Sequence, residues 1–209
     1  MRARARRPTP ETLVRRPQPG EAAAVAELLH ASAADMYNRF AGGRERAVRA
    51  LELAFHEPEN SAAADAVWVA ELEGQLGAAM AAFPVEEALP RSRAFLRLAL
   101  RRAPIWRWPA ALRLYWLGGR ASPSPPPAAF YIDALATDPS MRRRGLARAL
   151  LDEAERQART RGLPSVALDT TLDNKPARSL YLSEGFEEVA YRPPTRTLPG
   201  FVALVKPLD

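Results

Sequence analysis

Short apolar segments alternate with segments of helical periodicity along most of this chain. An apolar strand is predicted over 130–137, and an amphipathic helix over 145–161 follows it. Further strands are predicted at 12–16, 67–72, 75–83, 165–170, 186–191 and 201–205, and further helices at 21–34, 44–55 and 176–183. Because each element must bury its apolar face against another layer, this alternation predicts an α/β or α+β layered domain.

The stretch 84–128 interrupts the alternation. It contains helix-like pieces separated by Pro90, Pro104 and Pro109, and it ends in a proline-rich segment typical of a stiff linker. A chain of 209 residues is long enough for one substantial core, so we expect a single domain over 11–209 with a helical insert at about 84–128. Its mixed arginines and aromatic residues fit a flap packed on its own domain. A partner or homodimer surface, or contact with a membrane surface, stays open.

The basic residues are concentrated in two segments. The net charge is +6, but residues 1–10 hold four arginines and no acid, and 84–128 hold eight arginines against two glutamates. The rest of the chain is therefore net acidic. It has no lysine-rich run interleaved with aromatic residues, so we do not expect direct nucleic-acid binding. We interpret 1–10 as a disordered basic tail.

Composition excludes several kinds of site. There is no cysteine, and His30 and His56 alone do not suffice for a histidine-built zinc site, so we expect no metal. No run approaches the roughly 18 apolar residues of a membrane span. The basic start is not followed by the apolar segment of a secretory signal. These features favour a cytoplasmic protein with no membrane partner.

The junction between the predicted strand 130–137 and the helix after it carries the first chemical signal. Three successive arginines precede Gly145 there. Glycine lets a ligand approach the backbone closely, and the helix that begins at this point presents unpaired N–H groups and its positive dipole end. This favours an anion site suited to the diphosphate of a nucleotide cofactor. The alternative is an ordinary strand-to-helix turn with a solvated arginine run.

The second signal is the stretch 168–186. Asn174 is placed to cap a helix, Pro176 suits its first turn, and Gly185 is placed to end it. On these grounds alone, Tyr181 in that helix is more typical of packing than of an acid catalyst.

Together the two stretches resemble the GNAT superfamily of acetyl-CoA-dependent N-acetyltransferases. Arg142, Gly145 and Ala147 match the family's Gln/Arg-x-x-Gly-x-Gly/Ala pyrophosphate motif, with Ala147 replacing the commoner glycine. The segment from Asn174 to Phe186 matches its second cofactor motif, one helix and one strand further along.

The resemblance is specific over 130–191, topological over 12–83 and absent over 84–128. It implies a mixed, mostly antiparallel central sheet flanked by helices, to which the helical insert is an addition. It also implies that acetyl-CoA is the co-substrate and that the acceptor is a primary amine of a small molecule or protein.

The cofactor residues are carried over from the resemblance. Backbone groups of Leu135, Ala136 and Thr137 would bind the pantetheine arm. Tyr181 would be the general acid that protonates the leaving thiolate. The remaining cofactor ligands would be the pyrophosphate loop and an amide beyond it: Arg142, Arg143, Arg144, Gly145, Leu146, Ala147, Arg148 and Asn174.

The general base stays open at this point. A primary amine holds its proton up to about pH 10.4, so a base has to remove that proton before the amine attacks. Asp133 lies near where some family members place an acid. Asp169 lies where the ribosomal-protein N-terminal acetyltransferases place a glutamate, and Glu71 is a third candidate. Each is alternatively a solvated or strand-edge carboxylate.

Two other functions are weighed against this one. A GNAT-like module that binds acyl-CoA without turnover would not need Tyr181 or a base. A nucleic-acid-associated protein would use the basic tail and insert, but the acidic charge of the remaining chain disfavours it. The acceptor stays open among an antibiotic, a polyamine, an amino acid and a protein N-terminus.

Overall fold

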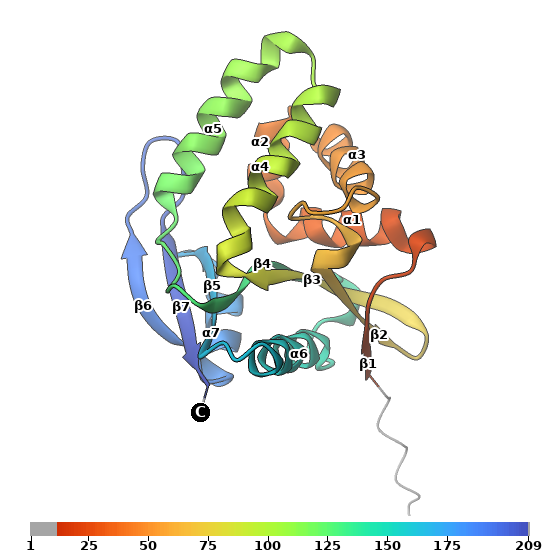
Figure 1. Ribbon diagram of the computed structural model, residues 1–209, viewed down its shortest axis with the longest axis vertical. Helices are drawn as coiled ribbons and strands as arrows, with labels where there is room; N and C mark the ends of the chain where they lie inside the picture. The colour runs from red at the N-terminus through yellow and green to blue at the C-terminus, as the bar shows by residue number, and fades with distance from the viewer. Residues whose placement is uncertain (1–11, 209) are drawn as a thin grey trace, which may run out of the picture.

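The computed structural model describes residues 12–208, so the expected tail 1–10 lies outside the described residues. Its centre is a seven-stranded sheet in the order β1-β2-β3-β4-β5-β7-β6 (Figure 1). The strands are β1 (Thr12–Arg15), β2 (Val67–Leu72), β3 (Gln75–Pro84), β4 (Ala129–Thr137), β5 (Ser165–Thr171), β6 (Glu187–Arg192) and β7 (Phe201–Pro207). The helices are α1 (Ala22–Ser32), α2 (Ala34–Ala41), α3 (Arg44–Phe55), α4 (Val85–Arg102), α5 (Trp108–Ala121), α6 (Leu146–Thr160) and α7 (Lys175–Ser183).

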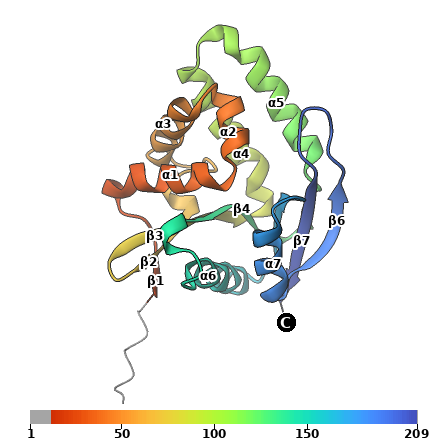
Figure 2. The ribbon, with the colours of Figure 1, turned by 180° about the vertical axis from the view of Figure 1, so that it is seen from behind.

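The strand directions confirm the predicted mixed sheet. Every neighbouring pair is antiparallel except β4 and β5, which are parallel. Helices lie on both faces, with α1 to α5 on one side and α6 and α7 on the other (Figures 1 and 2). The chain therefore has the layered α/β architecture that the alternating pattern and the resemblance indicated.

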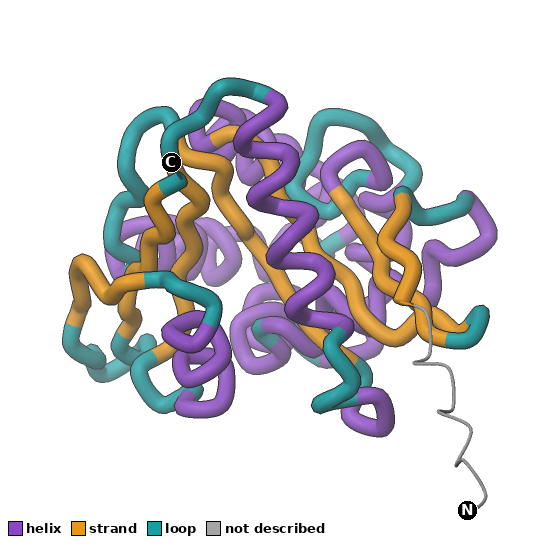
Figure 3. The backbone as a smooth tube through the Cα atoms, turned by 90° about the horizontal axis from the view of Figure 1, so that it is seen from below, coloured by secondary structure: helices purple, strands orange, loops and turns teal. Residues whose placement is uncertain are grey.

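The side chains of the central strands contribute to two apolar cores, one on each face of the sheet. On β2, Trp68 and Ala70 belong to the core under α6, while Val67 and Val69 belong to the core under α1 and α3. Successive strand residues point to opposite faces, so a strand covered on both sides needs a continuous apolar sequence. Helix α6 crosses the sheet diagonally in Figure 3. Its buried stripe is Leu146, Leu150, Leu151, Ala154 and Ala158.

The parallel strands β4 and β5 separate part-way along their length. They pair over four residues each and stop at Ile132 and Leu168. Beyond that point β4 continues along β3, and β5 continues along β7. The sheet is thus split between two strands that point the same way.

Asp133 is a β-bulge at the start of this split. The register between β4 and β3 passes from Ile132 opposite Ala82 to Ala134 opposite Ala81, so Asp133 has no partner on β3 in the described sheet. A bulge disrupts the ladder locally and re-aims a side chain. Ala134 packs in the core under α1, and Asp133 lines a cavity on the same side of the sheet.

The insert forms two helices rather than several short pieces. Pro104 separates α4 from α5, as predicted, but α4 runs uninterrupted through Pro90. A proline can adopt a helical φ, but it removes one backbone hydrogen bond. Helix α4 compensates for this loss by packing Phe95, Leu96 and Leu98 against the rest of the domain. Pro109 lies in the first turn of α5, where its missing N–H is not needed.

Helix α2 is absent from the sequence prediction, which gave a single helix over 21–34. The break between α1 and α2 falls at Ala33, a residue whose sequence carries no turn signal. Within 12–208 no helix is both long and apolar enough to cross a membrane.

Candidate active site

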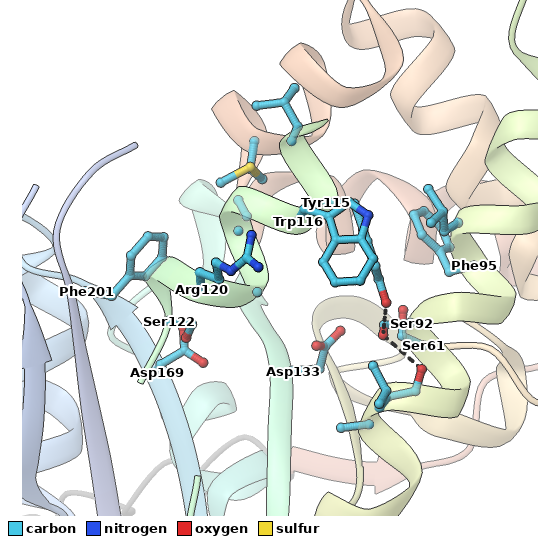
Figure 4. Close-up of a pocket in the computed structure, with 18 of the residues that line it drawn as sticks. Ser61, Ser92, Phe95, Tyr115, Trp116, Arg120, Ser122, Asp133, Asp169 and Phe201 are labelled. Carbon is cyan, nitrogen blue, oxygen red and sulfur yellow. Dashed lines mark hydrogen bonds between the residues drawn. The ribbon is translucent and has the colours of Figure 1, made fainter. Parts of the chain in front are cut away.

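A cavity of ≈ 600 Å³ lies on the α1–α5 side of the sheet, where β4 and β5 separate (Figure 4). Asp133 from β4 and Asp169 from β5 line it, as does Tyr131. Both carboxylates come one residue after the last paired position of their strands. The split of the sheet therefore brings the two predicted base candidates to one site.

Asp133 is exposed to solvent at the cavity, although many protein atoms surround its carboxyl group. Burial, and to a smaller extent the neighbouring charge of Asp169, together raise the pKa of Asp133 to about 7. An acid with this pKa is partly ionised at neutral pH. It can accept a proton far better than an ordinary aspartate, so the position suits a general base.

Asp169 is held by Tyr131, whose hydroxyl donates a hydrogen bond to its Oδ1 atom. Burial raises the pKa of Asp169, while Tyr131 and the nearby Ser122 hydroxyl act in the opposite direction. Ser122 lies beside Asp169 in Figure 4 but makes no hydrogen bond in good geometry within the described chain. The pKa of Tyr131 is raised well above its usual value by burial and by both aspartates, so Tyr131 stays a donor.

Tyr181 lies on the other face of the sheet, in the core shared with α6. Gly185, with φ +85°, ends α7, and the N–H of Phe186 bonds the carbonyl of Tyr181 at 3.0 Å. This closure packs the ring of Phe186 against that of Tyr181, 5.8 Å between centroids. Burial raises the pKa of Tyr181 to about 12, with a smaller contribution from the charge of Asp169. Its hydroxyl is therefore protonated at neutral pH.

The turn before α6 has the features of an anion site. Gly145 begins the helix with φ +89°, and no atom of the described residues beyond its chain neighbours lies within 4 Å of the place a Cβ would take. No acceptor within 12–208 is found for the N–H groups of Leu146, Ala147 and Arg148. An open glycine next to three free donors is the arrangement that backbone binding of phosphate requires.

The arginines of this turn differ in their surroundings. Arg142, Arg143 and Arg144 are exposed, and Arg142 donates to the carbonyl of Thr137 at 3.5 Å. Arg148 forms an ion pair with Glu184 at 2.7 Å, which links the start of α6 to the end of α7. The exposed arginines add positive field around the turn, while Arg148 has a structural partner.

The other predicted cofactor residues also lie along the split. Leu135, Ala136 and Thr137 pair with β3 only, so β4 offers no strand neighbour on its other edge within the described sheet. Asn174 caps α7, accepting from the N–H of Ala177 at 3.4 Å and donating to Thr170 Oγ1 at 3.1 Å. The cap predicted at Asn174 is confirmed, and its amide is engaged within the protein.

Glu71, the third base candidate, lies elsewhere. It pairs with Arg15 at 2.7 Å near the β1 edge of the sheet, and it is not among the cavity's lining residues. Within 12–208 no group of three or more His, Asp or Glu side chains is arranged to hold a metal ion.

Sequence reasoning missed Tyr131 and the helix α2. Tyr131 lies two residues before Asp133 and opposite Ala167, two residues before Asp169. Because alternate strand residues share a face, this spacing was the available signal. Tyr37 and Phe40 of α2 form another wall of the cavity and were hidden by the missed helix.

Comparison with known proteins agrees with this geometry. The Acetyltransferase (GNAT) family model matches residues 27–186. The aminoglycoside N(6')-acetyltransferase type 1 of Klebsiella aerogenes is 48% identical over 52 residues, 25% of this chain and 34% of that one, so the chain spans about a third of its length. An N-acetyltransferase structure from Staphylococcus aureus Mu50 has a TM-score of 0.70 at 18% identity, covering 92% of this chain and 99% of the other. A second acetyltransferase structure scores 0.64 at 20% identity, covering 94% and 100%. Because the family match spans most of its length, this chain belongs to the GNAT family of acetyltransferases.

Proposed function

We propose that this enzyme transfers the acetyl group of acetyl-CoA to a primary amine at the split between β4 and β5. The observation that carries the proposal is the position of Asp133. It is a bulged carboxylate with a pKa of about 7, at the floor of a cavity and at the mouth of the split. A base with this pKa is matched to removing a proton from an amine near neutral pH.

The split also suits the co-substrate. The free donors at Leu146, Ala147 and Arg148 would hold the diphosphate, and Gly145 leaves room for it. The unpaired edge of β4 over Leu135 to Thr137 offers backbone groups for the amide-rich pantetheine arm. A pantetheine arm bound along this edge would bring the thioester near Asp133, because Asp133 lies on the same strand two residues before Leu135.

The acceptor amine would enter from the cavity. An amine that resembles lysine is protonated up to about pH 10.4 and cannot attack in that form. Asp133 is proposed to take the proton, either directly or through a water molecule. Asp169 is proposed to hold the ammonium group in place, because its Oδ1 is already bonded to Tyr131 and its other oxygen is left to accept.

Tyr181 is proposed to act from the opposite face. With Asp133 and Tyr181 on different sides of the sheet, the base and the donor approach the split from two directions. A thiol has a pKa of roughly 8.5, below the value of about 12 for Tyr181, so a complete proton transfer from the phenol would be uphill. The hydroxyl is therefore expected to stabilise the leaving thiolate by donating a hydrogen bond.

The proposal is tested by two measurements on the purified chain. Calorimetry measures whether acetyl-CoA binds, and a thiol reagent measures whether free CoA is released when amines are added. Binding with amine-dependent release supports acetyl transfer. Binding without release from any amine would indicate a module that holds acyl-CoA without turnover.

A further inference from the structure

We infer that the acceptor is an apolar monoamine, with one primary amino group on an aromatic or branched aliphatic body. Arylalkylamines are the simplest members of this class. The inference rests on the proposed acetyl transfer and specifies the molecule that occupies the cavity.

Six aromatic side chains from α2, the insert and β7 line the cavity. They are Tyr37, Phe40, Phe95, Tyr115, Trp116 and Phe201. The chain has only 16 aromatic residues, so a large share of them line this cavity. Such walls bind an apolar body by removing its surface from water.

Several of these rings support one another. Phe95 of α4 contacts Tyr37 edge-on and Phe40 face-on, with ring centroids 6.4 Å apart in each pair. Tyr115 of α5 is hydrogen-bonded to Ser92 of α4 at 3.1 Å (Figure 4). The two helices of the insert, α4 and α5, thereby contact each other, and α4 also contacts α2. The cavity walls are therefore preformed for a ligand of defined shape.

Charge in the cavity is confined to two places. Asp133 and Asp169 lie at the split, and Arg120 is the one cationic side chain among the residues that line the cavity. Arg120 lies on α5 beside Trp116, with its guanidinium carbon 5.8 Å from the ring centroid (Figure 4). One ammonium group therefore finds carboxylates, while a second would face Arg120, serine hydroxyls or aromatic rings, none of which carries a negative charge.

This distribution discriminates between classes of amine. Polyamines and aminoglycosides carry several ammonium groups, and each group beyond the first would lose water without gaining a carboxylate. Repulsion by Arg120 adds to that cost. An uncharged apolar body loses little hydration free energy on entering the cavity, and it gains contact with the aromatic rings.

The first test ranks acceptors by kcat/KM for CoA release. We expect 2-phenylethylamine to exceed both spermidine and kanamycin by at least ~10-fold, the factor that burial of one aromatic group supports. Equal or better rates with either polycation would overturn the inference. A higher rate with phenylalanine than with 2-phenylethylamine would also overturn it, because Arg120 would then bind an acceptor carboxylate.

The second test uses a matched pair of variants on α5. Arg120→Glu places an acid in the cavity wall and should raise the spermidine-to-phenylethylamine ratio of kcat/KM by about 5-fold or more. Arg113→Glu makes the same charge change at an exposed position outside the cavity lining and should leave the ratio unchanged. An unchanged ratio in Arg120→Glu, or equal changes in both, would contradict the inference.

Binding measurements separate this inference from the proposed function. If no amine is acetylated, calorimetric titration of 2-phenylethylamine and spermidine into the CoA-bound protein still ranks the two ligands. Tighter binding of 2-phenylethylamine would then support the inference while acetyl transfer fails. Turnover of polycations without turnover of apolar monoamines would refute the inference and leave acetyl transfer intact.

Discussion

Asp133 and Asp169 stand on neighbouring parallel strands, each one residue past the last pair, and face one cavity. The charge of Asp169 is the second cause, after burial, of the raised pKa of Asp133. The two groups are therefore coupled, and the protonation of one depends on the charge of the other.

The first prediction is the pH dependence of the parent enzyme. Asp133 has to be ionised to accept a proton, and its pKa is about 7. Acetylation of 2-phenylethylamine should therefore rise with pH through a limb centred near pH 7, measured as kcat/KM from pH 5 to pH 9. Asp133→Asn should lower the rate at pH 7 by ~10²–10⁴-fold and recover partly at high pH, where free amine is available. A parental profile in Asp133→Asn would remove Asp133 from the mechanism.

The second prediction concerns stability. The folded-state pKa of Asp133 lies above its ordinary value of 3.8, so the folded protein binds more protons than the unfolded chain between about pH 4 and pH 7. This group's contribution to stability is thus present at low pH and lost as pH rises through about 7. Asp133→Asn should be more stable than the parent at pH 8, with the difference shrinking toward pH 4 in urea unfolding. A variant less stable than the parent at pH 8 would contradict the raised pKa of Asp133.

The third prediction tests the coupling. Asp169→Asn keeps an oxygen for the Tyr131 hydroxyl but removes the charge that raises the pKa of Asp133. The rise of kcat/KM with pH should therefore shift to lower pH. Burial of Asp133 should still keep the midpoint of this rise above the pKa of an ordinary aspartate. Should the midpoint stay at the parental pH, the two carboxylates would not interact as the structure indicates.

The sequence predicted the elements that local chemistry determines. Asn174 and Gly185 mark the two ends of α7 because a cap and a left-handed glycine are local devices. The mixed direction of the strands came from the family resemblance, since periodicity says nothing about strand direction. The prediction that Pro90 interrupts a helix in the insert was wrong, because tertiary packing of α4 outweighs the one hydrogen bond lost there.

The site was predicted in part. Asp133 and Asp169 were named from their strands, but the bulge at Asp133 appears only in the register with β3. The sequence of one strand does not show where its partner strand has one residue fewer. The aromatic walls depend on α2 and on how α4 and α5 fold back, which are contacts between distant parts of the chain.

The fourth prediction concerns acetyl-CoA binding at the start of α6. Gly145→Glu puts a side chain and a negative charge where the free N–H groups point, so calorimetry should show loss of binding. Gly162→Glu is the matched control at the far end of α6, with φ +66° and equally open surroundings. Both variants carry backbone strain of order 1–3 kcal/mol, but only the first should lose the ligand. Equal affinities in the two variants would place the diphosphate elsewhere.

The fifth prediction concerns Tyr181. Tyr181→Phe removes the hydroxyl but keeps the ring that packs on Phe186, so the melting temperature should hardly change. Affinity for acetyl-CoA should also survive. Turnover should fall by about 10²-fold or more, because the leaving thiolate loses its donor. Tyr191→Phe, at an exposed position on β6, is the control and should retain the parental rate.

Since the loss comes from a donor to a leaving group, acetyl donors with a more acidic thiol should be less affected by Tyr181→Phe. If turnover is unchanged in Tyr181→Phe with acetyl-CoA itself, Tyr181 is a packing residue and the donor lies elsewhere.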